Sequence, residues 1–276
     1  MPHAHVSTTY LELNAGFDPY ARSVAIPAET DNNGIHVWKR GRVRFRHPVV
    51  QTQFAISLLG EYAATDDFGK MFLADVNARD LLKHAADGWV LEYGFDFSLH
   101  GDVANTIHAP WRSAMAQGLF LSLATRLQAA TEDPYWLEAA HGVFATLHDE
   151  SSPKWVTFTD PDGYTWLEEY AGDVEPMRVL NGHIFAMYGL YDYWQATQHA
   201  DALALFNRAA ATVLRYVPHL HVPGQVSWYG MRIQDNPKAQ SPKYHAIHIR
   251  QLGMLANMTG DPEFRELAGL LAGNPR

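Results

Sequence analysis

The chain has 276 residues, 47% of them hydrophobic and 18% charged, which is long and apolar enough for a globular protein with a large core. Its formal net charge of -9 argues against nucleic acid as a partner, and the absence of cysteine excludes disulfides and thiol chemistry. No apolar run approaches the roughly 20 residues needed to cross a bilayer, so we predict no membrane span.

The first residues, Met1 to His5, lack the charged start and the apolar core of a secretory signal. We therefore expect either a cytoplasmic protein or a chain that has been trimmed.

Residues 1–47 contain Pro, Gly and Asn breakers without helical periodicity, and we predict a small N-terminal β region there. After a turn at 31–34, residues 35–46 alternate like a β-hairpin. In a strand, one face would carry four arginines: Arg40, Arg42, Arg44 and Arg46. Such a row suits carboxylate or sulfate groups along a polymer, and it equally suits a solubilising outer face. Arg42 and Arg44 are candidates for substrate binding.

From residue 48 onward the apolar pattern is helical and repeats. Breaks after apolar helices recur roughly every 65 residues, which is typical of repeated helical hairpins. They fall at Thr65, Thr131, Thr197 and Thr259. The predicted helix pairs are 49–64 with a helix to 86, 113–130 with a helix to 147, 181–198 with a helix to 216, and 244–258 with a helix to 271.

Aromatic, strand-like segments at 89–99, 155–170 and 226–233 separate these pairs, and the second contains the turn sequence Asp160-Pro161-Asp162-Gly163. In a ring of hairpins all three would emerge at one end, because each follows an outer helix and precedes an inner one. We predict a mainly α fold, an (α/α) barrel of about four helical hairpins over residues 48–276. Short β-hairpin inserts at one end would form its active face.

The second insert ends in two carboxylates and a phenol, Glu168-Glu169-Tyr170. The ordinary pKa values of Glu and Tyr differ by roughly six units, so in a cleft such a pair can serve the two ends of a proton transfer. Solvated loop carboxylates are the plainer interpretation. Further aromatic and polar side chains at the predicted mouth favour a sugar-binding cleft.

A metal site is a rival interpretation of this mouth. His245 and His248 lie three residues apart on a predicted helix, and His3 and His5 are able to chelate. No HExxH or carboxylate–histidine motif accompanies them, so we predict no catalytic metal and no cofactor. The sequence leaves a structural divalent cation open.

Several blocks resemble the D-glucuronyl C5-epimerase family, in that family's order, from about residue 47 to the C-terminus. Residues 110–118 (PWRSAMAQG) are similar to its Trp-Tyr-Ser-Ala-Met-Ala-Gln-Gly signature. Residues 168–170, 179–182 (VLNG) and 189–192 (GLYD) resemble its second block. Residues 229–232 (YGMR) and 244–248 (YHAIH) resemble its closing block. The chain differs in having Arg112 where the family has Tyr, and Met177-Arg178 in a loop that is Ser-Phe or similar there.

The resemblance implies an isomerase that inverts C5 of D-glucuronate in a heparosan-like acidic polysaccharide and so produces L-iduronate. Inversion needs a proton carrier on each face of C5. The matched positions are Glu169 or Tyr170 on one side and Tyr244 on the other, with Tyr229 binding or relaying. A cation should stabilise the enediolate-like state, and Arg232 is the first candidate.

The remaining candidates for substrate binding are Arg178, Arg112, Trp111, Gln117, Asn181, His183, His245 and His248. A Tyr acts as a base only if nearby cations lower its pKa, a role open to Arg232, His245 or His248. Structural roles compete with these assignments. Tyr244 fits a helix-start contact, Asn181 a helix cap, and the histidines a packed core.

Other functions remain open at this point. A polysaccharide lyase also removes the C5 proton of a uronate. An inverting glycosidase needs two carboxylates about 6.5–9.5 Å apart, for which Asp96 and Glu169 are available. A noncatalytic subunit that binds acidic polysaccharide would use the arginine row, and a homodimer is a further possibility.

Overall fold

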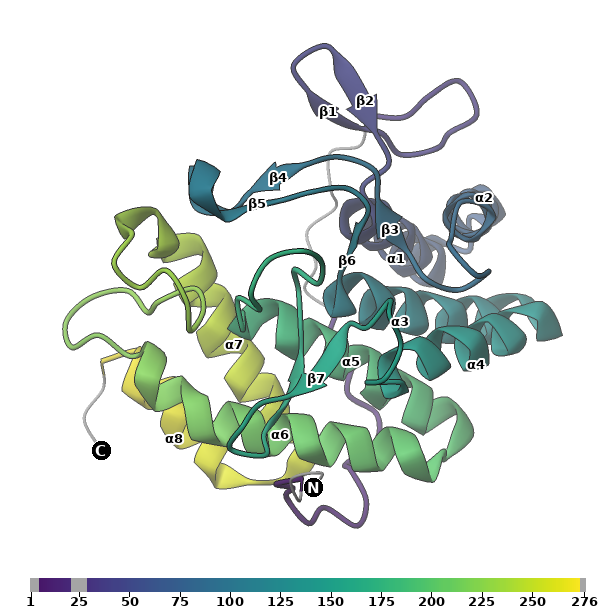
Figure 1. The fold of residues 1–276 in the computed structure, drawn as a ribbon. Coiled ribbons are helices and arrows are strands. Elements are labelled where there is room, and N and C mark those ends of the chain that lie inside the picture. The colour runs from purple at the N-terminus through teal and green to yellow at the C-terminus, as the bar shows by residue number, and fades with distance from the viewer. Residues whose placement is uncertain (1–4, 21–28, 274–276) are drawn as a thin grey trace.

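The computed structural model describes residues 5–20 and 29–273. Within them, eight α-helices pair into four antiparallel hairpins, as predicted (Figure 1). The pairs are α1 (Pro48–Thr65) with α2 (Phe68–Lys83), α3 (Ala114–Thr131) with α4 (Pro134–His148), α5 (Leu180–Thr197) with α6 (Ala200–Leu220), and α7 (Pro242–Thr259) with α8 (Pro262–Leu271).

The same side-chain arrangement makes all four hairpin turns. Each inner helix ends in a threonine whose hydroxyl donates to the carbonyl four residues earlier and accepts the backbone N–H two residues later. The residue between them has a positive φ, from 55° to 71°. The threonine spacing seen in the sequence is therefore a repeated helix-ending turn.

The inner helices α3 and α5 approach more closely than side chains would allow. A Cβ on Gly189 would lie 2.1 Å from the carbonyl oxygen of Gly118, and one on Gly118 would lie 2.4 Å from Cα of Ala186. Glycine is required at both positions because the two backbones touch. This contact forms the rigid centre of the barrel.

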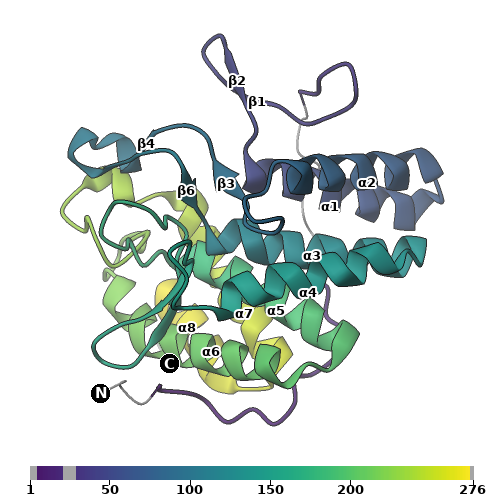
Figure 2. The ribbon, with the colours of Figure 1, turned by 45° about the vertical axis from the view of Figure 1, so that its right-hand side comes forward.

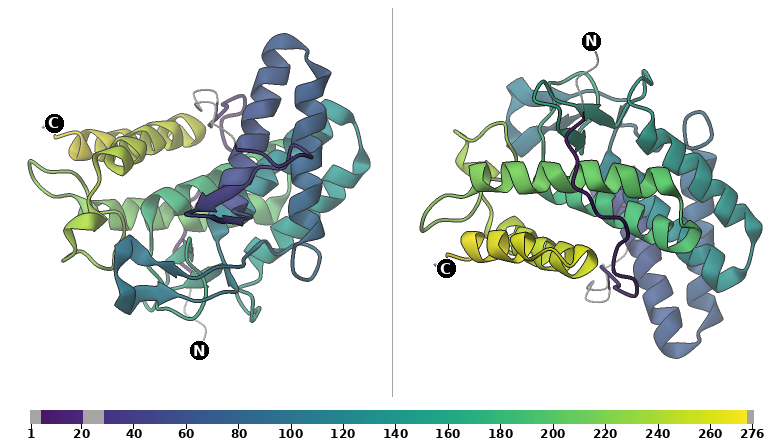
Figure 3. Two further views of the ribbon diagram at one scale, coloured as in Figure 1. Left: turned by 90° about the horizontal axis from the view of Figure 1, so that it is seen from above. Right: turned by 90° about the horizontal axis from the view of Figure 1, so that it is seen from below.

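The inner helices follow one another as α1, α3, α5 and α7, and each packs on the next. A pocket with lining residues from both helices separates α1 from α7. Viewed from above, the hairpins form an arc with these two pairs at its ends (Figure 3). The predicted (α/α) barrel is confirmed, and it is open on one side.

The first two inserts form β structure at one end of the helices (Figure 2). In the first, β3 (Glu92–Tyr93) pairs with β6 (Trp111–Arg112) and β4 (Phe97–Ser98) with β5 (Thr106–Ile107), around the short 3₁₀ turns η1 (Leu99–Gly101) and η2 (Val103–Asn105). In the second, β7 (Thr157–Thr159) pairs with β8 (Thr165–Leu167) across the predicted turn at 160–163.

The strand-like prediction for 226–233 is wrong. That segment makes only isolated bridges, Val179 with Gly230 and Trp228 with Gln240, before the 3₁₀ turn η3 (Pro237–Ala239). It crosses the start of α5 as an irregular loop, so it has no partner strand to pair along.

The predicted N-terminal hairpin is present as β1 (Trp38–Arg40) and β2 (Val43–Phe45), which projects from the barrel (Figure 1). The single-face arginine row is wrong, because the turn falls at Gly41-Arg42 and divides it between two strands. Arg40 donates to the carbonyl of Asp96, and Arg46 pairs with Asp80.

Residues 5–20, the first described segment, contain no helix or strand and lie across α6 when the molecule is seen from below (Figure 3). Leu13 and Tyr20 belong to the same apolar core as the helices. The boundary at 47/48 stays a prediction. No helix in the described part of the chain is long and apolar enough to cross a membrane.

Candidate active site

A pocket of about 430 Å³ lies where the inserts meet the N-terminal turns of α3, α5 and α7. Its walls come from every inner helix, from the first two inserts and from the β1 hairpin. The lining residues are Trp38, His47, Val49, Val50, Gln53, Tyr93, Phe97, Trp111, Met115, Glu169, Tyr170, Asn181, Phe185, Lys243, Tyr244 and Ile247. Five of the predicted site residues therefore meet here: Trp111, Glu169, Tyr170, Asn181 and Tyr244.

The two adjacent glutamates play different parts. Glu168 is fully buried, and its two carboxylate oxygens accept the backbone N–H groups of Tyr170 and Arg178, each at 2.9 Å. Its carbonyl accepts the N–H of Ala114 at the start of α3. Glu168 thus ties three segments together and leaves the next side chain, Glu169, directed into the pocket.

Glu169 rests against the first turn of α5. A Cβ at Gly182 would lie 2.2 Å from Oε2 of Glu169, so only glycine leaves room for the carboxylate. Burial raises the pKa of Glu169 to about 7, although hydrogen bonds from tyrosines oppose that rise. A carboxylate with this pKa is suited to accept a proton near neutral pH.

Three tyrosines surround this carboxylate. The Tyr229 hydroxyl donates to Glu169 at 3.0 Å from Oε1 and 3.2 Å from Oε2, and lies 3.3 Å from the Tyr170 hydroxyl. The rings of Tyr229 and Tyr244 have centroids 4.6 Å apart. Tyr229 does not line the pocket, and it connects Glu169 to the two tyrosines that do.

The pKa values of these tyrosines run against the sequence-based expectation. Burial, followed by the nearby Glu169 charge, raises the pKa of Tyr170, Tyr229 and Tyr244 above the usual 10. Burial also lowers the pKa of His245 and His248, so neither provides a cation at neutral pH. The expected lowering of a tyrosine pKa is therefore wrong, and these phenols are protonated at neutral pH.

Aromatic rings form one wall of the pocket. Trp111 stacks on Tyr93 at a centroid distance of 3.7 Å and donates from Nε1 to the carbonyl of Phe95. Tyr170 lies parallel to Phe97 at 5.9 Å. Asn181 also lines the pocket, and its buried Oδ1 has no hydrogen-bond partner among the described residues. A pocket lined by apolar rings and a few polar groups suits a sugar.

Arg232, the predicted cation for the substrate carboxylate, and Arg178 and Arg112, two further candidates for substrate binding, do not line the pocket. Arg232 donates to the carbonyl of Glu175 and to Oδ1 of Asn105. Arg112 faces Glu92 at 3.4 Å. Arg178 has a φ of +53° and gives its backbone N–H to Glu168. These arginines secure the loops around the site, and the assignment of the carboxylate cation to Arg232 needs correction.

Four other predicted residues have structural partners outside the pocket. Gln117 bonds the backbone of Leu91 and Trp89. His183 is buried between Leu167 and Ala209. His245 and His248 both contact Ser227. Position in a motif did not distinguish them from pocket residues.

Neither the glycosidase alternative nor the metal alternative gains support from the described residues. Asp96 uses Oδ1 to accept the N–H of Ala109 and does not line the pocket. No cluster of three metal-ligating side chains occurs in the described ranges. His3 lies outside the described residues, and His5 contacts Thr159 and Arg208 on the surface.

Three residues that line the pocket were not among the predicted site residues: Lys243, His47 and Trp38. Lys243 directly precedes Tyr244, which was the available signal. His47 caps α1, and burial lowers its pKa to about 4, so it is neutral in the pocket. Trp38 comes from the β1–β2 hairpin. The periodicity of the helical region gives no indication that this side chain lines the pocket.

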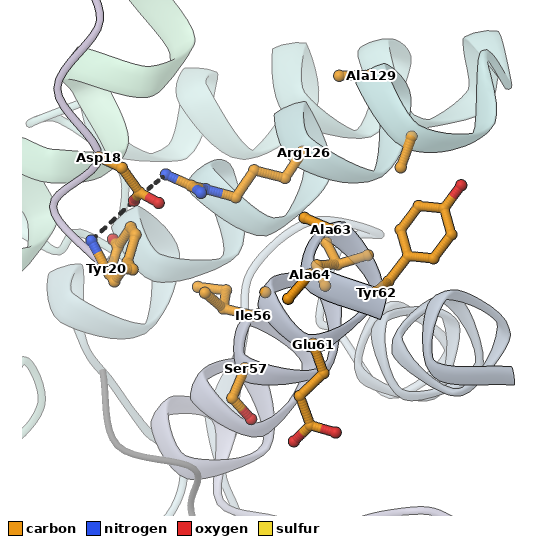
Figure 4. Close-up of a pocket in the computed structure, with 13 residues that line it drawn as sticks. Asp18, Tyr20, Ile56, Ser57, Glu61, Tyr62, Ala63, Ala64, Arg126 and Ala129 are labelled. Carbon is orange, nitrogen blue, oxygen red and sulfur yellow. Dashed lines mark hydrogen bonds and ion pairs between the residues drawn. The ribbon is translucent and has the colours of Figure 1, made fainter. Parts of the chain in front are cut away.

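A second, larger cavity of about 780 Å³ lies between the C-terminal halves of α1 and α3 (Figure 4). Its charged centre is Arg126, which pairs with Asp18 and Asp192 and lies over the ring of Tyr20. Because that charge is already compensated and alanines line much of the remaining surface, this cavity offers less chemistry than the first pocket.

The fold is shared with sugar-converting enzymes. The chain is similar to the solved structure of a D-mannose isomerase (TM-score 0.64, 13% identity, 90% of this chain and 66% of that one). It is also similar to a sugar epimerase from a ruminal bacterium (TM-score 0.63, 14% identity, 83% and 59%). At these identities the likeness establishes the helical-hairpin fold.

The sequence comparison identifies the family. Residues 87–271 match the sequence profile of the D-glucuronyl C5-epimerase C-terminus, and the chain belongs to this family. It is 28% identical over 178 residues to an uncharacterised protein of Methanocaldococcus jannaschii (62% of this chain, 53% of that protein). It is 28% identical over 166 residues to D-glucuronyl C5-epimerase of Caenorhabditis elegans (55% and 26%). The chain thus spans about half or less of the length of these curated relatives.

Proposed function

We propose that this chain is a uronate C5-epimerase that converts D-glucuronate to L-iduronate within a heparosan-like acidic polysaccharide. The observation that carries the proposal is the pairing of Glu169, whose pKa is raised to about 7, with Tyr244 in one pocket, connected through Tyr229. Membership of the family supports the same reaction.

The residues divide the reaction into two proton transfers. The ionised Glu169 takes the C5 proton, and the electron pair of the broken C–H bond moves into the adjacent carboxylate as an enediolate. Tyr244, protonated because its pKa is raised, then gives its hydroxyl proton to the opposite face of C5. A new C–H bond forms with inverted configuration.

The tyrosine cluster also returns the enzyme to its starting state. After turnover Glu169 carries a proton and Tyr244 lacks one. Tyr229 donates to Glu169 and packs on Tyr244, so it is placed to pass one proton from the acid to the phenolate. The reverse direction uses the same groups, so the reaction is expected to be reversible.

The surroundings of the pocket fit a polymer. The partly exposed, parallel rings of Phe97 and Tyr170 offer an apolar surface for a sugar ring, and the amide of Asn181 lies in the same pocket. Arg42 and Arg44 are exposed on the β1–β2 hairpin, whose Trp38 reaches the pocket. We place neighbouring acidic sugars of the chain along this hairpin. A homodimer stays a prediction.

Proton NMR of heparosan and N-sulfated heparosan incubated with the protein in deuterium oxide tests the proposal. We expect deuterium at C5 and the appearance of iduronate signals. A rise in ultraviolet absorbance from an unsaturated uronate would identify a lyase instead. Unchanged polymer in both preparations would overturn the proposal.

A further inference from the structure

The proposed reaction requires a positive charge that the predicted arginines do not provide. Removing the C5 proton places a second negative charge on a group that is already a carboxylate. A cation that contacts this group binds it more strongly in the transition state than in the ground state. This difference in interaction energy lowers the barrier to proton removal. Arg232, Arg178 and Arg112 do not line the pocket.

Among the described residues that line the pocket, Lys243 is the one whose side chain is positively charged at neutral pH. His47, the other basic residue there, is neutral because burial lowers its pKa to about 4. Lys243 and Tyr244 lie four and three residues before Ile247, so each is one turn of α7 away from it, and all three line the pocket.

The ammonium group of Lys243 is available to a ligand. Its Nζ lies 5.7 Å from the centroid of the Tyr244 ring, beside the proposed proton donor. No carboxylate in the described part of the chain forms an ion pair with it. The side chain is exposed at the pocket rim, so it is able to meet an incoming anion.

Two electrostatic features make this position unusual for a lysine that only solubilises the surface. Lys243 is in the first turn of α7, where the helix dipole disfavours a cation. The whole chain also has a formal net charge of -9, which repels an anionic polymer. A cation at the pocket provides attraction at the reacting sugar itself, which the exposed Arg42 and Arg44 of the hairpin do not reach.

We propose that the Lys243 ammonium binds the carboxylate of the uronate being epimerised and stabilises its enediolate. The proposal rests on the proposed function and names the residue that selects a uronate over a neutral sugar. Lysine acts here as a point charge, which does not require the fixed two-bond geometry of arginine. A sugar chain that fills the pocket displaces water and strengthens this interaction.

The decisive variant is Lys243→Met, which keeps the length of the side chain and removes the charge. We expect kcat for C5 deuterium exchange to fall about 100-fold, in the range found when one charge-stabilising group is removed. Lys243→Arg should recover most of the rate. Lys238→Met, a change at an exposed lysine outside the pocket, should stay within about twofold of wild type. Tm should be unchanged or slightly higher in Lys243→Met, since a disfavoured helix-start charge is lost.

A binding measurement separates this inference from the proposed function. Calorimetry would compare a glucuronate-containing oligosaccharide with its methyl ester. Wild type should prefer the acid by about tenfold, and Lys243→Met should bind the two equally. If Lys243→Met keeps the preference, or exchanges C5 at the wild-type rate, the role of Lys243 is overturned while the epimerase proposal stands. If wild type shows the preference without any C5 exchange, the carboxylate site stands and the epimerase proposal falls.

Discussion

The two sides of the barrel are built in opposite ways. On one side α3 and α5 touch backbone to backbone through Gly118 and Gly189. On the other side α1 and α7 lie apart with the pocket between them. The closed side leaves no room for a ligand, and on the open side the pocket takes the place of such a close helix contact.

The proposed catalytic groups are distributed across these two sides. Glu169 rests on the first turn of α5, next to the closed contact, whereas Tyr244 and Lys243 stand on α7 at the open side. The base is therefore fixed by packing on α5, and the proton donor and the cation come to the same pocket from α7. The close contact between α3 and α5 thus holds the base in position, and the gap between α1 and α7 admits the ligand.

The sharpest test of the closed side is Glu169→Gln, which retains the shape of the side chain and removes the base. We expect C5 exchange to fall by about 10³-fold, with Tm close to wild type at pH 5 and higher than wild type at pH 8, where the buried carboxylate is ionised. Glu175→Gln, at an exposed carboxylate that pairs with Arg232, serves as the control and should remain active. An active Glu169→Gln enzyme would remove the base from the proposal.

Gly189→Ala tests whether the closed contact holds the fold. Its new methyl group would meet the backbone of Gly118, which cannot move aside, so the free energy of unfolding should fall by about 3 kcal/mol or more. Gly253→Ala on α7 has no neighbour within 4 Å and should be neutral or stabilise by up to about 1 kcal/mol. Chemical denaturation measures both, and equal losses would contradict the asymmetry.

On the open side, Tyr244→Phe removes the proton donor and leaves the ring. Turnover should fall by about 10²-fold while oligosaccharide affinity is retained, because the aromatic surface is unchanged. Paired rate and binding measurements check this. Full turnover by the phenylalanine variant would assign Tyr244 a packing role.

The pH dependence follows from Glu169. This group must be ionised to accept a proton, so kcat/KM should rise about tenfold per pH unit below about 7 and then level off. The free energy of unfolding should show the opposite dependence on pH. The folded pKa of about 7 exceeds the ordinary 4.5, so the folded state binds more protons, and its stability falls as pH rises through 7. Thermal melts at pH 5 and pH 8 should show a smaller decline in Glu169→Gln.

The smallest effect is expected at the β1–β2 hairpin. Replacing Arg42 and Arg44 by Gln should raise KM for a long polymer a few-fold and leave kcat unchanged, because exposed charges attract at long range only. The effect should vanish in high salt. A loss of kcat would place these residues closer to the reaction than the structure does.

The amino-acid sequence by itself determined the helices, their pairing and the end of the barrel that carries the site. Local chemistry explains this success, since each hairpin turn is set by a threonine and its close neighbours, such as Thr131 with Asp133. The motif residues Glu169, Tyr170 and Tyr244 were likewise recognisable in order along the chain.

Only the tertiary structure decided which motif residues face the pocket and what charge they carry. Glu168 and Glu169 are adjacent in sequence, yet one binds backbone N–H groups and the other faces the pocket. Arg232 belongs to a motif but donates to the carbonyl of Glu175 outside the pocket. Lys243 lines the pocket although no spacing in the sequence predicted it. The physical reason is that side-chain direction, burial and pKa depend on neighbours distant in the chain, which a local pattern does not encode.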